Sequence, residues 1–146
     1  MEKELEQSGE SLAALIGQQW EIPRKRTMQY SPLVLAYIGD AVFDLVVRTI
    51  LVEKTNEPVN VLHKKSAAMV KATAQTELYH RIEEMLSEDE MAVFKRGRNA
   101  KSHTTAKNAS VSDYRCATGV EALIGYLYLE GNMERILELL KAGLLN

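Results

Sequence analysis

Hydrophobic residues recur at helical spacing along the chain, and this pattern predicts an all-α fold. Residues 33 to 53 form a long apolar run whose charged positions are Asp40, Asp44, Arg48 and Glu53. The first three of these lie four residues apart and share one helical stripe. The run therefore predicts a single helix that is buried on most of its surface. No alternating strand pattern of useful length is present.

Further helices are predicted downstream of Pro58. Residues 59 to 86 carry helical spacing that indicates two helices or one bent helix. Ser87 and Glu90 have the spacing of a capping box, which predicts a helix that ends near Gly97. Residues 97 to 110 are small, polar and basic and predict a loop.

The C-terminal part of the chain predicts two more helices. One runs from near Ser112 to a glycine stop at Gly131. The last has an apolar face made of Met133, Ile136, Leu137, Leu140 and Leu144.

The N-terminal residues 1 to 32 are predicted to be an accessory region, separate from a main domain at residues 33 to 146. The region begins with an acidic stretch and carries the cationic triplet Arg24-Lys25-Arg26 before Pro32. Its few apolar residues allow one weak amphipathic helix, and the alternative is a partly ordered tail.

Length and composition fit one ordinary globular domain. The chain has 146 residues, with only 8 glycines and 3 prolines, and few chain breakers favour helices. A single cysteine, Cys116, rules out an internal disulfide and a multi-thiolate zinc site. The acidic start does not resemble a secretory signal, and no apolar stretch reaches the length of a membrane span. These features predict a cytoplasmic protein without a membrane partner.

The net charge of −2 identifies no partner, but the charges are unevenly distributed. The segment from Lys95 to Asn108 contains five cations and no acids, so one face could attract a polyanion. Without aromatic residues for stacking, the segment suits contact with a nucleic-acid backbone, and the alternative is a solvated loop. The candidate residues for contact with such a backbone are Lys64, Arg96, Arg98, Lys101 and Lys107.

Two carboxylates, Asp40 and Glu121, lie in separate apolar helices. Buried carboxylates are paired or bind a metal, because their desolvation is costly. Each could therefore form an ion pair, or both could converge on a divalent cation, for which Mg²⁺ is the best match to hard oxygen ligands. Gly39 and Gly125 are also unusual in helix interiors and indicate close helix contact or close approach of a substrate.

Four motifs resemble the ribonuclease III family, and specifically its short branch, Mini-ribonuclease III. The segments 35–47 (LAYIGDAVFDLVV), 61–70 (VLHKKSAAMV) and 120–130 (VEALIGYLYLE) resemble the signature helix, the following helix and the second acidic helix of the family. The segment 95–105 (KRGRNAKSHTT), which runs without interruption, resembles the corresponding segment of the short branch.

The resemblance implies an all-helical endonuclease domain that acts as a two-fold homodimer on double-stranded RNA. It assigns the catalytic and metal-binding roles to Asp40 and Glu121, with Mg²⁺ as cofactor, and places Tyr37 at the dimer contact. It further implies products with 5′-phosphate ends. The implied substrate is the precursor of large-subunit (23S) ribosomal RNA, with possible help from a large-subunit ribosomal protein.

Two positions depart from the ordinary ribonuclease III pattern. Ala36 and Thr118 stand where that family has further acids, so the number of metals per site is left open. Asp44 is expected to support the site or the fold. The missing acids also allow a catalytically inactive module that binds RNA or the ribosome. A third alternative is a helical interaction protein with no RNA role.

Overall fold

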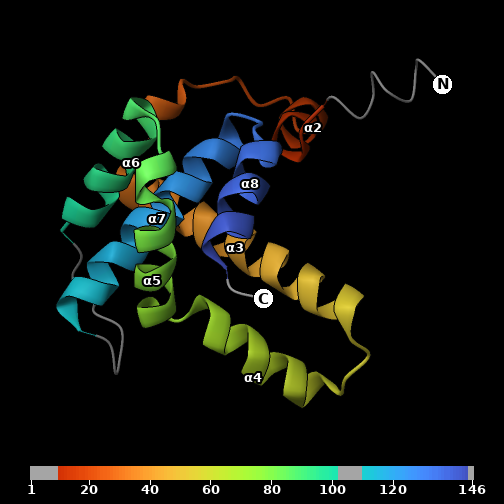
Figure 1. Cartoon of the computed structure of the whole chain (residues 1–146). Coiled ribbons are helices and arrows are strands. Elements are labelled where there is room, and N and C mark those ends of the chain that lie inside the picture. The colour runs from red at the N-terminus through yellow and green to blue at the C-terminus, as the bar shows by residue number, and fades with distance from the viewer. Residues whose placement is uncertain (1–9, 102–109, 145–146) are drawn as a thin grey trace.

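The structure, a computed structural model, describes residues 10–101 and 110–144, and all regular structure in these ranges is helical (Figure 1). The all-α prediction is therefore confirmed for this part of the chain. The α-helices are α2 (Leu12–Gln19), α3 (Pro32–Lys54), α4 (Val59–Val70), α5 (Ala72–Ile82), α6 (Glu88–Asn99), α7 (Val111–Leu129) and α8 (Met133–Gly143). Short 3₁₀ turns lie at Thr27–Gln29, between α2 and α3, and at Glu83–Met85, between α5 and α6.

Helix boundaries follow from local capping chemistry. The Ser31 hydroxyl accepts a hydrogen bond from the Val34 amide at 3.2 Å, and Pro32 begins α3. Lys71 adopts an extended conformation, so residues 59 to 82 form two helices rather than one bent helix. Both bonds of the predicted capping box are present between Ser87 and Glu90, at 2.9 and 3.1 Å.

Helix α7 forms the centre of the molecule. Its buried side chains include Val120, Leu123 and Leu127, each at most 3% exposed. Helices α3, α5, α6 and α8 pack around it, as Figure 1 shows. A helix that is covered on several sides carries apolar residues all round, which explains the long apolar run from residue 116 to 129.

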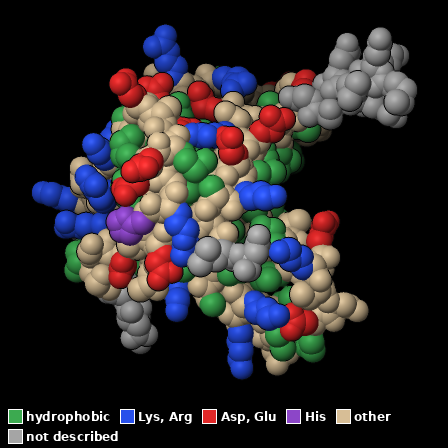
Figure 2. Space-filling model, viewed as in Figure 1, with side chains coloured by type: hydrophobic (Ala, Val, Ile, Leu, Met, Phe, Trp, Pro, Cys, Tyr) green, Lys and Arg blue, Asp and Glu red, His purple; other side chains and the backbone are tan. Residues whose placement is uncertain are grey.

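Helix α6 continues beyond Gly97, so the prediction of a loop from residue 97 was wrong for residues 97–99. Gly97 lies against α7, where a Cβ atom would come within 2.7 Å of Ala122 Cβ. The glycine thus allows close helix packing instead of ending the helix. Lysine and arginine side chains gather at the edge of the molecule where α6 lies (Figure 2). Residues 102–109 of the predicted loop lie outside the described residues.

Two predictions about helix faces were wrong. Helix α3 is not buried on most of its surface, because Tyr37, Leu45 and Val52 are 81%, 57% and 62% exposed. On α8, Leu137 is 48% exposed and Leu139 is buried in its place. The buried stripe of α8 follows Ile136, Leu139, Leu140 and Gly143, and Leu137 lies beside it.

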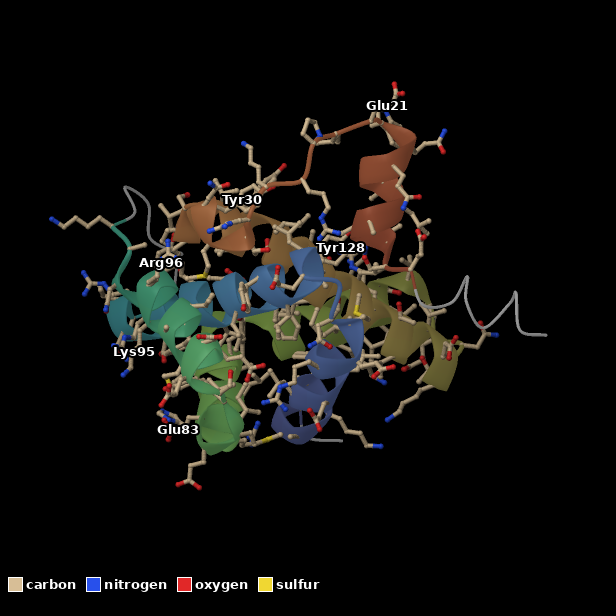
Figure 3. All side chains as sticks on the ribbon, turned by 90° about the horizontal axis from the view of Figure 1, so that it is seen from above. Glu21, Tyr30, Glu83, Lys95, Arg96 and Tyr128 are labelled. Carbon is tan, nitrogen blue, oxygen red and sulfur yellow. The ribbon has the colours of Figure 1, made fainter. Side chains whose placement is uncertain are left out.

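Helix α2 begins at a serine cap, where the Ser11 hydroxyl accepts a hydrogen bond from the Ala14 amide at 3.1 Å. The helix contains no fully buried residue. A pocket of about 420 Å³ lies between α2 and the rest of the fold and is lined in part by Tyr30, Ile38 and Tyr128. Figure 3 shows the two tyrosines from above. Among the described residues, no helix is both long and apolar enough to cross a membrane.

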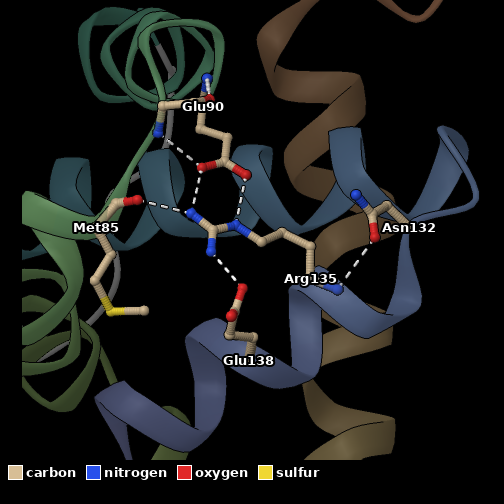
Figure 4. Close-up of polar contacts among 6 residues, drawn as sticks. Met85, Glu90, Asn132, Arg135 and Glu138 are labelled. Carbon is tan, nitrogen blue, oxygen red and sulfur yellow. Dashed lines mark hydrogen bonds and ion pairs between the residues drawn. The ribbon is translucent and has the colours of Figure 1, made fainter.

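A buried ion pair joins α6 to α8 (Figure 4). The Arg135 guanidinium donates through Nε and Nη2 to the two oxygens of Glu90, both at 2.9 Å, and through Nη2 to the Met85 carbonyl at 2.7 Å. Glu138, which is exposed, also accepts a hydrogen bond from Arg135. The Glu90 side chain is 9% exposed, so its charge depends on this partner.

We expect Arg135→Met to lower the free energy of unfolding by about 3 kcal/mol at pH 7, because it leaves the Glu90 carboxylate buried and unpaired. The hydrogen bond from Arg135 holds the pKa of Glu90 below its usual value of 4.5. A lowered pKa stabilises the fold above the unfolded value, and this contribution is lost as the pH falls through the folded pKa. Urea unfolding should therefore show a smaller difference between variant and wild type at about pH 3 than at neutral pH.

The control for this prediction is Glu138→Gln, which removes the exposed partner of the same arginine. It is expected to change the free energy of unfolding by at most about 1 kcal/mol. An Arg135→Met difference that stays constant with pH would show that packing, rather than the ion pair, explains the loss.

Candidate active site

Helices α3 and α7 cross in backbone contact at two glycines. A Cβ atom on Gly39 would lie 1.7 Å from the Glu121 carbonyl oxygen and 2.7 Å from the Gly125 nitrogen. A Cβ atom on Gly125 would lie 1.9 Å from the Leu35 carbonyl oxygen. Neither position can hold a side chain in this arrangement. Of the two explanations considered for these glycines, close helix contact is the one that the structure shows.

The crossing brings Asp40 and Glu121 together. Asp40 follows Gly39 directly, and Gly39 lies against the backbone of Glu121. The Asp40 carboxylate is close enough to Glu121 to raise the pKa of the Glu121 carboxyl. Asp40 is exposed, and Glu121 is partly buried. Asp40 therefore lies at the rim of the site. The expectation that both carboxylates are buried is wrong for Asp40, and Glu121 is only partly buried.

Burial raises the pKa of Glu121 to about 7, well above its usual value of 4.5. A hydrogen bond from the Gln75 amide opposes this rise, whereas the nearby Asp40 carboxylate adds to it. No lysine, arginine or histidine forms an ion pair with either carboxylate within the described ranges. The environment of Glu121 thus lacks a positive charge that would stabilise its ionised form.

Gln75 is the site residue that sequence reasoning missed. It lies on α5, is 2% exposed, and donates from Nε2 to Glu121 Oε2 at 3.1 Å. Its Oε1 atom is buried and has no hydrogen-bond partner among the described residues. Its helical spacing could have shown that Gln75 is buried, because Gln75 falls on the same helical face as the buried Leu78, Tyr79 and Ile82.

The residues present fit a small divalent cation. Two adjacent carboxylates without a cationic partner offer hard oxygen donors, and the amide of Gln75 beside Glu121 carries an oxygen that is still unpaired. Mg²⁺ in proteins is commonly held by one or two carboxylates, with water and substrate phosphate completing its octahedron. No group of three or more histidine, cysteine or acidic residues could hold a metal in the described part of the chain. The donor set is therefore the sparse kind that suits Mg²⁺ shared with a substrate.

The two positions that depart from the family pattern add no charge to the site. Ala36 is buried at 7% exposure. Thr118 is also buried, and its hydroxyl donates to the Tyr114 carbonyl at 3.0 Å. Asp44 lies one turn beyond Asp40 and pairs with Arg48 at 2.9 Å. Asp44 is therefore held in a surface ion pair on the same helix.

The predicted RNA-binding residues occupy two regions. Lys64 is exposed on α4, whereas Arg96 and Arg98 lie on α6, with the exposed Lys101 just beyond its end. Arg96 points toward Tyr30, whose carbonyl accepts from Nη2 at 3.5 Å (Figure 3). Arg98 lies 5.7 Å from the Phe94 ring. Lys107 lies outside the described residues.

Comparison with known proteins agrees with this architecture. The Ribonuclease III domain family matches residues 33–132. A Mini-ribonuclease 3 of Clostridium tetani is 52% identical over 122 residues, which cover 83% of this chain and 81% of the relative. A Mini-ribonuclease 3 of a Thermoanaerobacter species is 51% identical over 120 residues, which cover 82% and 84% of the two chains.

A crystal structure of a Fusobacterium nucleatum protein has the same fold. Its TM-score is 0.75 at 30% sequence identity, and the match covers 80% of this chain and 96% of that protein. The resemblance found in the four sequence motifs is confirmed by these matches. The chain belongs to the ribonuclease III family, in its Mini-ribonuclease 3 branch.

Proposed function

We propose that this protein is a metal-dependent endoribonuclease that cleaves double-stranded RNA. The observation that carries the proposal is the meeting of Asp40 and Glu121 at the α3–α7 crossing, without a cationic partner among the described residues. Family membership supports the same activity, because the relatives are named as ribonucleases. Residues 33–146 would form the catalytic domain, with residues 1–32 as an accessory region.

Asp40 and Glu121 would hold the cation, for which we propose Mg²⁺. A bound divalent cation supplies charge stabilisation at the attacked phosphate and lowers the pKa of water. Exposed Asp40 would face the substrate side, and partly buried Glu121 would anchor the site from within the fold. In-line attack by water would leave 5′-phosphate and 3′-hydroxyl ends.

The basic residues would hold the duplex by its backbone. A-form RNA is recognised mainly through its phosphates, its 2′-hydroxyls and its shape. We propose contacts from Lys64, Arg98, Lys101 and Lys107, with Arg96 at the inner edge of this surface, where it contacts the Tyr30 carbonyl. Binding through phosphates predicts an affinity that falls steeply with salt.

We propose that two copies pair through the exposed stripe of α3. Val34, Tyr37, Leu45 and Val52 lie on one side of that helix and are 48% to 81% exposed. A two-fold dimer places two symmetry-related sites against two antiparallel RNA strands. Tyr37 would lie at the dimer contact. Sedimentation equilibrium tests this proposal, and a purely monomeric protein would refute it.

The substrate we propose is the precursor of large-subunit (23S) ribosomal RNA, which would place the reaction in the cytoplasm. The names of the relatives support ribonuclease activity. The substrate, and a large-subunit ribosomal protein as the expected partner, are what the resemblance to the short branch implies. Cleavage of a precursor transcript, compared with and without the large-subunit proteins, tests the proposal. Failure to cut the precursor under both conditions would refute it.

A long, perfect RNA duplex at low salt tests the activity itself. Cleavage should require Mg²⁺ and stop when EDTA is added. Duplex binding without cleavage, on both this duplex and the precursor, would favour an inactive RNA-binding module, as Ala36 and Thr118 would suggest. Absence of both binding and cleavage would reject an RNA role.

A further inference from the structure

Gln75 carries a buried amide whose two N–H groups are both used. Nε2 donates to the Val70 carbonyl at 2.9 Å and to Glu121 Oε2 at 3.1 Å. The first bond reaches the end of α4, and the second reaches the candidate site on α7. Gln75 therefore links the junction between α4 and α5 to the Glu121 carboxylate.

These two bonds fix the orientation of the amide. If the oxygen and nitrogen of the amide were exchanged, the oxygen would face two acceptors, the Val70 carbonyl and the Glu121 carboxylate. Only the observed orientation gives both acceptors a donor. It also leaves Gln75 Oε1 buried and without a hydrogen-bond partner in the described part of the chain.

The two donated bonds account for Nε2, but they do not account for Oε1. The position lies on the apolar face of α5, beside Leu78 and Ile82, where an unpaired polar atom is costly. A buried acceptor that lacks a donor costs about 1–3 kcal/mol. Such an atom in a folded protein calls for an explanation, which can be strain, a catalytic role, or a bound water or ion.

We infer that Gln75 is a positioning residue for the metal site, an inference that rests on the proposed function. Its Nε2 orients the Glu121 carboxylate, and its Oε1 supplies a neutral oxygen acceptor for the cation or the water around it. Amide oxygens are suitable partners for hard cations and their waters. Gln75 thereby provides polar support in a site where Ala36 and Thr118 supply no carboxylate.

The first test is Gln75→Met, which keeps a long, flexible side chain and removes both the donor and the acceptor. Titration calorimetry with Mg²⁺ and with Mn²⁺, without RNA, measures the dissociation constant of the metal. We expect binding to weaken by about 10- to 100-fold, the usual effect of losing a group that orients a metal ligand. Duplex affinity measured in EDTA should not change.

The matched control is Thr76→Val on the same helix. The Thr76 hydroxyl donates to Asp113 Oδ1 at 2.7 Å, so this change also removes a polar link between α5 and α7. It does not contact Glu121. We expect metal affinity to stay at the wild-type value in Thr76→Val, and equal losses in both variants would attribute the effect to helix packing and overturn the inference.

A second variant, Gln75→Glu, keeps the test decisive if Gln75→Met does not fold. It retains an oxygen acceptor, loses the donor to Glu121 and adds a negative charge. We expect a lower Tm without metal, and a larger Mg²⁺-induced rise in Tm than in the wild type. A rise no larger than that of the wild type would overturn the inference.

Different results would refute the role of Gln75 and the proposed metal-dependent nuclease function. Wild-type metal affinity in Gln75→Met would remove Gln75 from the site and leave the proposed nuclease intact. A wild-type protein that binds neither Mg²⁺ nor Mn²⁺, with or without RNA, would overturn the metal-dependent function and the role of Gln75 with it.

Discussion

Replacing Asp40 with asparagine is expected to slow cleavage of an RNA duplex by about 10³-fold or more, because the site loses one of its two carboxylates. The new side chain has nearly the same shape as the old one. Asp40 is exposed and forms no ion pair with a described residue, so the fold does not depend on its charge. Single-turnover cleavage with excess enzyme measures the chemical step directly.

Neither duplex affinity nor thermal stability should decrease in Asp40→Asn. The Asp40 carboxylate raises the pKa of Glu121 by repulsion, and this repulsion disappears in the variant. The melting temperature should therefore not fall. Removal of a negative charge beside a polyanion should leave duplex affinity in EDTA at least as high as in the wild type.

Asp44→Asn is the control for this prediction. Asp44 lies one turn away on the same helix, but its charge is paired with Arg48 on the surface. Loss of such a pair changes stability by at most about 1 kcal/mol, and cleavage should remain near the wild-type rate. Cleavage that survives Asp40→Asn, or an equal loss in Asp44→Asn, would contradict the assignment of Asp40.

Much of the fold could be predicted because its signals are local. The capping box of Ser87 and Glu90 acts within four residues, and it marks a helix start without any tertiary information. Gly97 was wrongly predicted to end a helix, because a glycine that ends a helix and a glycine that allows close packing of a neighbouring helix look alike in sequence. The open stripe of α3 was missed because apolar residues on every side of a helix do not reveal what covers them.

The candidate site was predictable only in part. Asp40 and Glu121 stood out because a charge in an apolar helix is costly and requires an explanation. Their meeting depends on the packing of α3 against α7, which no periodicity within either helix encodes. Gln75 is neutral and next to polar residues, so its place in the site emerged only when α5 was packed against α7.

At the glycine crossing of α3 and α7, Gly39→Ala should lower the free energy of unfolding by about 3 kcal/mol or more, because the methyl group of the alanine has no space. The new Cβ atom would lie 1.7 Å from the Glu121 carbonyl oxygen, a backbone atom that cannot rotate away. The helices must separate, and Glu121 must then move relative to Asp40. A displacement of about 1 Å at a catalytic site can reduce the rate by roughly 100-fold.

Gly17→Ala is the matched control, because Gly17 also lies within a helix but nothing is within 4 Å of its added Cβ atom. Alanine there should stabilise the helix by up to about 1 kcal/mol, since it restricts the unfolded chain. Urea unfolding of both variants measures the effect on stability, and single-turnover cleavage measures the effect on the catalytic rate. If Gly39→Ala were as stable and active as Gly17→Ala, the backbone contact between α3 and α7 would not be what holds Asp40 beside Glu121.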